Sequence, residues 1–145
     1  MIWLLRHAHA LRGAPDAERP LSDRGALEAA AAGRALAVLG VAFDACLTSP
    51  KVRALDTARL ACAELGVEPE VERALSGGDF DAAALAAGRG RQVVLVGHEP
   101  DMSRAIGDLT GARVALAKGG VAAIDGRELK LLLRPEELRE LARLR

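Results

Sequence analysis

Short apolar runs alternate along the chain with longer stretches in which apolar residues recur every three or four positions. The runs are continuous, as is typical of strands buried on both faces of a sheet. The longer stretches have the spacing of helices with one buried face. This alternation predicts a three-layer α/β/α fold with a mainly parallel central sheet. The predicted buried strands are residues 2–5, 43–48 and 93–96.

Local signals set the expected boundaries of the helices. Ser22 is a suitable N-cap for the first helix, and Pro50 and Pro100 suit the first turns of two others. A glycine follows each of these helices and is expected to end it, because glycine readily adopts the left-handed conformation. Those glycines are Gly40, Gly66 and Gly111. The remaining predicted helices are an alanine-rich one ending near Ala87 and a last one that begins at Pro135 and carries Arg139, Arg143 and Arg145 late, which suits the helix dipole.

The other segments are predicted to be loops and edge strands. Residues 8–21 contain prolines, glycine and charges, so we expect a long loop, which in a compact domain is usually functional or mobile. Residues 70–72 are a candidate edge strand, and 121–124 with 129–133 a candidate antiparallel hairpin near a sheet edge. No repeat, low-complexity tract or linker interrupts this pattern. A single domain over residues 1–145 is therefore predicted.

Composition narrows the classes of function. Among 145 residues, 20 Lys and Arg balance 20 Asp and Glu, which disfavours nucleic acid or a membrane surface as partner. Two Phe, one Trp and no Tyr leave few rings for base stacking. The apolar start is too short for a signal peptide or a membrane span, and Cys46 and Cys62 form no CxxC pair. We therefore expect a cytoplasmic protein whose cysteines are reduced core residues.

Candidate chemistry lies where the predicted strands end, because ligands of open α/β sheets bind beyond the carboxyl ends of the strands. The residues at these ends are Arg6 and His7 after the first strand, Arg53 one turn after the second, and His98 after the third. In a parallel sheet these ends share one edge, so we expect the four side chains to lie close together. Two arginines and two imidazoles repel a cation and suit a phosphoryl group, whose oxygens match the arginine fork.

This group of residues predicts phosphoryl transfer. One imidazole would attack phosphorus and form a phosphohistidine that water then hydrolyses. The attacking ring must be neutral, and neighbouring cations lower its pKa toward that form; a cationic second ring would help to hold the oxygens. Ser49 and Thr57 are expected to be structural. Two other classes stay open: a module that binds a phosphate group without turnover, and a metal hydrolase that uses His7, His9, His98 and Asp101, although the arginines would place positive charge beside its metal.

Three ordered segments resemble the signatures of the histidine phosphatase superfamily, which has the phosphoglycerate mutase-like fold. They are LLRHAHA at 4–10, SPKVRALDTA at 49–58 and LVGHEP at 95–100. The short length, DAERPLSDRG at 16–25 and KGGVAAI at 118–124 resemble the SixA-type phosphohistidine phosphatase branch. The resemblance implies that His7 is phosphorylated, and that the rest of the substrate site consists of Arg6, Arg53, His98 and an additional arginine, Arg19. It implies no metal or other cofactor, and a phosphorylated protein or a small phosphoester as substrate.

The chain departs from the family pattern at two positions. His9 stands where many members have Glu or a small polar residue, and we expect it to be a solvated loop residue or a substrate contact. Ala74 stands where many members have a Glu that acts as general acid. Asp79 and Asp81 lie nearby, although acids beside Gly-Gly are more often turn formers or helix caps. A missing acid favours phosphohistidine over sugar phosphates, because imidazole needs less protonation to leave than an alkoxide.

Overall fold

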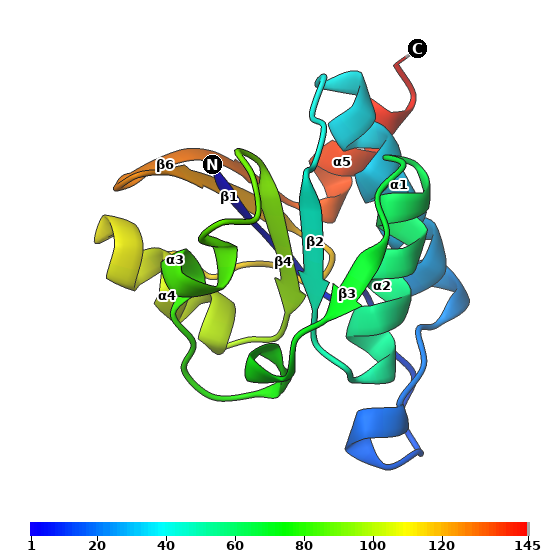
Figure 1. The fold of residues 1–145 in the computed structure, drawn as a ribbon. Helices are drawn as coiled ribbons and strands as arrows, with labels where there is room; N and C mark the ends of the chain where they lie inside the picture. The colour runs from blue at the N-terminus through cyan, green and yellow to red at the C-terminus, as the bar shows by residue number, and fades with distance from the viewer. Residues whose placement is uncertain (145) are drawn as a thin grey trace.

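The computed structural model describes residues 1–144 and contains a six-stranded sheet with the order β3-β2-β4-β1-β5-β6 (Figure 1). Strands β3, β2, β4 and β1 are parallel, while β5 runs antiparallel to β1 and β6 antiparallel to β5. The strand bounds are β1 Ile2–Arg6, β2 Ala45–Thr48, β3 Pro69–Val71, β4 Val93–Gly97, β5 Val121–Asp125 and β6 Glu128–Leu133. The predicted hairpin therefore forms one antiparallel edge of a sheet that is otherwise parallel.

Helices cover both faces of this sheet. Helices α1, α2 and α5 pack on one face, and α3 and α4 pack on the other (Figure 1). The helix bounds are α1 Asp23–Val38, α2 Val52–Ala63, α3 Ala82–Ala86, α4 Asp101–Thr110 directly after Pro100, and α5 Pro135–Ala142, with 3₁₀ helices η1 Asp16–Glu18 and η2 Arg73–Ser76. The predicted three-layer α/β/α fold is confirmed. The expectation for Arg145 lies outside the described residues.

Successive side chains of the central strands enter opposite halves of the core. Trp3 and Leu5 of β1 join the cluster that contains α1 and α2, whereas Leu4 joins the cluster that contains α4. All residues of β4 are buried. Because both faces of these strands are covered, positions 2–5 of β1 and 93–96 of β4 are all apolar, which explains the continuous runs in the sequence.

Two glycines allow helix α1 to approach its neighbours closely. A Cβ atom at Gly25 would lie 2.0 Å from the main-chain oxygen of His9, and one at Gly33 would lie 2.3 Å from that of Ala61. No larger residue fits at such distances without movement of the backbone. The first turn of α1 therefore packs against the segment that follows β1, and its middle packs against α2.

The predicted element boundaries hold at Ser22 and differ near Pro50. Ser22 caps α1, and its Oγ accepts the N–H of Gly25. Helix α2 begins two residues after Pro50, because the Oγ of Ser49 accepts the N–H of Lys51 at 3.1 Å and forms a turn before the helix. Strand β2 also begins two residues later than predicted, since the chain before it turns to bind the main chain of residues 91–92.

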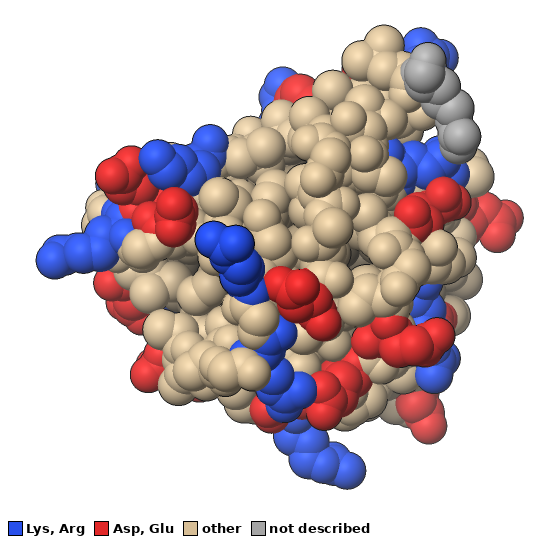
Figure 2. Space-filling model, turned by 45° about the horizontal axis from the view of Figure 1, so that its top comes forward, with Lys and Arg blue, Asp and Glu red and all other residues tan. Residues whose placement is uncertain are grey.

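The surface carries both signs of charge. Lys and Arg are interspersed with Asp and Glu over the face drawn in Figure 2. Both cysteines are free and buried, as predicted. Among residues 1–144, no helix combines the length and the apolar character needed to cross a membrane.

Candidate active site

The carboxyl ends of β1, β2 and β4 meet at one edge of the sheet. The parallel register pairs Arg6 with Gly97, and the N–H of His7 donates to the oxygen of Gly97 at 3.0 Å. The N–H of Ser49, directly after β2, donates to a main-chain oxygen of β4 at 3.0 Å. His7 and His98 therefore lie side by side, with their ring centroids 5.2 Å apart.

The ring of His7 is held in one orientation. It is buried, and its Nδ1 lies 2.8 Å from the main-chain oxygen of Ala8. A carbonyl oxygen can only accept, so Nδ1 carries the proton and Nε2 keeps the lone pair. The N–H of Ala8 donates to Oγ1 of Thr57 at 3.1 Å, and that hydroxyl donates to the oxygen of Arg53 at 2.7 Å. The segment of His7 and Ala8 is thereby fixed to helix α2, and Nε2 is the ring nitrogen whose lone pair remains available.

Burial lowers the pKa of His7 to about 4, because surroundings of low polarity disfavour the imidazolium ion. The hydrogen bond to Ala8 opposes this effect, and the positive charges of Arg53, Arg6 and Lys118 add to it. The sequence identified Arg6 and Arg53 but not Lys118, and the larger cause, burial, comes from the tertiary structure. The ring is neutral at pH 7, which is the form that can act as a nucleophile.

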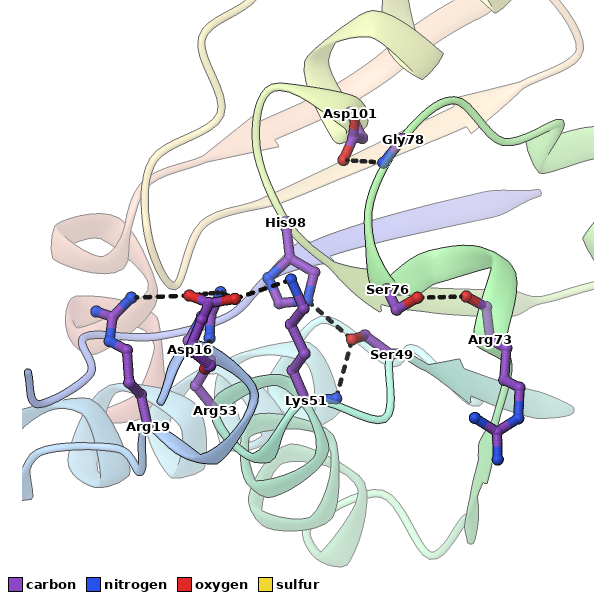
Figure 3. A network of polar contacts seen from close by, with 10 residues as sticks. All are labelled: Asp16, Arg19, Ser49, Lys51, Arg53, Arg73, Ser76, Gly78, His98 and Asp101. Atoms are coloured by element: carbon purple, nitrogen blue, oxygen red, sulfur yellow. Dashed lines mark hydrogen bonds and ion pairs between the residues drawn. The ribbon is translucent and has the colours of Figure 1, made fainter. Parts of the chain in front are cut away.

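His98 presents a hydrogen-bond donor. Its Nε2 lies 2.8 Å from the Oγ of Ser49 (Figure 3), which accepts the N–H of Lys51. The hydroxyl hydrogen is then free to bind Nε2, and we assign it to this bond, which places the ring proton on Nδ1. Burial, and then the charges of His7 and Arg53, lower the pKa of His98 to about 3. The second ring is therefore a neutral donor at pH 7, not the cation that the sequence suggested.

In both Arg6 and Arg53, one guanidinium nitrogen binds a main-chain oxygen and another has no hydrogen-bond partner. The Nη1 of Arg6 donates to the oxygen of Leu116 at 2.9 Å, and the Nη1 of Arg53 donates to the oxygen of Asp16 at 2.6 Å. The Nε of each arginine is buried and has no partner. Within residues 1–144, these two atoms and Nδ1 of His98 are the buried side-chain N and O atoms that lack a hydrogen bond. All three belong to the group that the strand ends predicted.

Arg19 is linked to this group through Asp16, which contacts both Arg19 and Arg53. Its Nε donates to the oxygen of Leu11 at 2.9 Å, and its Nη1 lies 3.6 Å from the carboxylate of Asp16. That carboxylate also lies 3.2 Å from Nη2 of Arg53 and 3.0 Å from Nζ of Lys51 (Figure 3). Sequence reasoning missed Asp16 and Lys51. The available signals were the long loop that carries the first and the strand end that precedes the second.

The two candidate general acids have other partners. Asp79 is exposed and forms an ion pair with Arg104. Asp81 accepts the N–H of Ala84 at 3.0 Å and caps α3. In the part of the chain that the structure describes, neither carboxylate forms a hydrogen bond or ion pair with the histidines and arginines of the site.

His9 is not a solvated loop residue. It is half-buried, and its Nδ1 lies 2.7 Å from the Oγ of Ser22, the N-cap of α1. Asp101, the other candidate ligand of a metal hydrolase, accepts the N–H of Gly78 at 3.1 Å. Of the four residues weighed for a metal, His7 and His98 lie side by side, but residues 1–144 contain no group of three or more His, Cys, Asp or Glu placed to hold a metal ion.

Comparisons with known proteins agree with this geometry. The sequence model of the histidine phosphatase superfamily (branch 1) matches residues 2–86. An uncharacterized protein of Picosynechococcus sp. is 37% identical over 138 residues, which cover 85% of this chain and 83% of that protein.

Solved structures extend the match over the whole fold. The protein histidine phosphatase SixA complexed with tungstate has a TM-score of 0.81 and 21% identity, covering 94% of this chain and 98% of the other. A protein assigned as phosphohistidine phosphatase SixA from Nakamurella multipartitia has a TM-score of 0.76 and 28% identity, covering 92% and 95%. The chain belongs to branch 1 of the histidine phosphatase superfamily and has the fold of its SixA-type members.

Proposed function

We propose that this protein is a phosphatase that transfers a phosphoryl group first to Nε2 of His7 and then to water. The observation that carries the proposal is the set of three buried N–H groups without a protein partner, on Arg6, Arg53 and His98. Buried donors normally have acceptors, and a phosphoryl group in transfer carries its charge on three equatorial oxygens. The neutral ring of His7 lies beside that of His98, within the field of Arg53 and Arg6.

The proposed reaction has two displacements at phosphorus. In the first, the lone pair of His7 Nε2 forms the N–P bond while the bond to the leaving group breaks, and the leaving group departs with its electron pair and takes up a proton from solvent. The charge on the phosphorylated ring strengthens the hydrogen bond from Nδ1 to the oxygen of Ala8. In the second, water forms a new O–P bond, the N–P electron pair returns to Nε2, and phosphate leaves while a water proton passes to solvent.

We infer that the substrate is phosphohistidine in another protein. Asp16 is the carboxylate in contact with Arg53, and its pKa is held at about 2, chiefly by its hydrogen bond with Lys51. It is ionised at pH 7 and has no proton to give to a leaving group. A leaving imidazole needs little protonation, whereas a sugar alkoxide needs a strong acid, so the site suits a phosphoramidate. The SixA-type fold supports the same substrate class.

The experiment compares turnover of a phosphohistidine-bearing phosphotransfer protein with turnover of sugar, nucleotide and aryl phosphates. It tests both the phosphatase activity and the proposed substrate class. We expect the phosphoprotein to have the highest kcat/KM. His7→Ala should abolish all turnover and still bind inorganic phosphate in calorimetry, because the three N–H donors remain. His9→Gln removes a histidine outside the donor group and should retain most of the activity.

Each other outcome has a distinct meaning. A preference for the small phosphates would overturn phosphohistidine as the substrate and establish a small-molecule phosphomonoesterase. Normal turnover by His7→Ala would refute the covalent mechanism. Phosphate binding by the wild type without turnover of any substrate would leave a binding module.

A further inference from the structure

Asp16 holds one end of the Arg53 guanidinium with both its main chain and its side chain. Its main-chain oxygen accepts from Nη1 of Arg53 at 2.6 Å, and its carboxylate lies 3.2 Å from Nη2 (Figure 3). The side chain of Arg53 is 7% exposed. Because the guanidinium is planar and rigid, fixing this end also fixes the direction of the opposite edge, where Nε lies. The Nε atom is buried and has no protein acceptor.

The carboxylate of Asp16 is itself held from two further sides. Nζ of Lys51 lies 3.0 Å from one oxygen, and Nη1 of Arg19 lies 3.6 Å from the other. The main chain of Lys51 in turn binds Ser49, the partner of His98. One exposed loop residue thus contacts three cations at the rim of the site, and the network continues to the second histidine.

Ionisation restricts what Asp16 can do. The contacts with Lys51 and Arg53 hold its pKa at about 2, so the carboxylate stays charged throughout the neutral range. It therefore cannot replace the missing general acid. The remaining roles are orientation of the cations and a change in their field, and these two effects act on phosphate affinity with opposite signs.

We propose that Asp16 is a positioning residue that aims the Nε edge of Arg53 at the phosphoryl group, and that the long loop of residues 8–21 exists in part to deliver it. The inference rests on the proposed function of the site. The negative charge of Asp16 by itself would weaken anion binding. However, 59% of the Asp16 side chain is exposed, so solvent and salt screen that repulsion. Solvent and salt do not weaken the effect that Asp16 has on the orientation of the buried Arg53. We therefore expect orientation to outweigh charge repulsion in its effect on phosphate affinity.

Three variants separate orientation from charge. Asp16→Ala removes the side-chain acceptor and the charge but keeps the main-chain oxygen that binds Nη1 of Arg53. Asp16→Asn removes the charge and keeps a side-chain acceptor oxygen for Arg53. Glu18→Gln removes a charge from the same 3₁₀ helix at an exposed residue that forms no ion pair within residues 1–144. Calorimetry with inorganic phosphate measures affinity, and aryl phosphate turnover measures kcat and KM. Thermal unfolding checks that each variant is folded.

We expect Asp16→Ala to bind phosphate about tenfold more weakly and to lose about tenfold in kcat/KM, because a misdirected arginine weakens the charge-assisted hydrogen bond from its buried Nε. Asp16→Asn should stay within about threefold of the wild type in both measurements, and Glu18→Gln should be unchanged. This rescue by the isosteric amide is a result that loss of charge alone does not produce.

Two outcomes would overturn the inference. Tighter phosphate binding by Asp16→Ala would show that the carboxylate competes with the anion, and equal behaviour of Asp16→Ala and Glu18→Gln would show that it does not position Arg53. Phosphate affinity is read without turnover. An inactive wild type therefore counts against the proposed phosphatase, while the affinities still decide the role of Asp16.

Discussion

Acidification from pH 6.5 to 4 is expected to destabilise this protein through its two neighbouring site histidines. Their pKa values are lowered by burial and by nearby positive charge, to about 4 for His7 and about 3 for His98. In the unfolded chain an imidazole titrates near 6.5. Between those values the unfolded state binds protons that the folded state does not, so the free energy of unfolding decreases as the pH falls. The contribution is fully present above about pH 6.5.

The size of the effect follows from the size of the shift. For His7 a lowering from 6.5 to about 4 corresponds to roughly 3 kcal/mol, at 1.36 kcal/mol for each pKa unit. Between pH 5.5 and 4.5 the folded ring is mostly neutral and the unfolded ring mostly charged. His7 alone should therefore remove about 1 kcal/mol of stability over that single pH unit.

Urea unfolding of the wild type and His7→Gln at pH 5.5 and 4.5 measures this contribution. Glutamine does not titrate and can still donate to the oxygen of Ala8. Asp and Glu residues elsewhere are the same in both proteins, so their contributions to the pH dependence of the unfolding free energy cancel in the comparison. The variant should lose about 1 kcal/mol less than the wild type across the interval. Equal losses, or NMR titration of the His7 ring with a midpoint near 6.5, would refute the assignment of a buried neutral nucleophile.

Two further predictions concern residues that support the site. Ser49→Ala removes the hydroxyl that orients His98 and caps the turn before α2. Because buried partners are left unpaired, we expect kcat/KM to fall by about tenfold and the free energy of unfolding by about 1–3 kcal/mol. Unchanged kinetics would show that the hydroxyl does not orient the ring. Gly25→Ala forces a Cβ to within 2.0 Å of a main-chain oxygen and should cost about 2–4 kcal/mol in urea unfolding, together with activity. Gly107→Ala is the matched control within a helix, because its Cβ would have its nearest contact at 3.5 Å, and it should be neutral or slightly stabilising; equal losses in the two variants would contradict the close approach of α1.

The sequence by itself predicted the layers and the edge of the sheet at which the candidate site residues lie. Strands covered on both faces must be apolar at every position, so the runs at 2–5 and 93–96 identified the centre of a parallel sheet. Arg6 and His7 directly follow one run, and His98 follows the other after a single glycine. Chain connectivity alone then places these residues at the same edge. The N-cap at Ser22 was equally predictable, because its bond to Gly25 spans only three residues.

Only the tertiary structure decided which polar partners these residues have and in which form they exist. Asp16 meets Arg53 across 37 positions, and Ser49 meets His98 across 49, so neither contact has a local sequence signal. The same holds for His9, which binds Ser22 instead of remaining in solvent. The lowered pKa values of the two site histidines come first from burial, which depends on how all the surrounding elements pack. A sequence specifies which side chains are available at a strand end, but their protonation and orientation depend on atoms that only folding brings near.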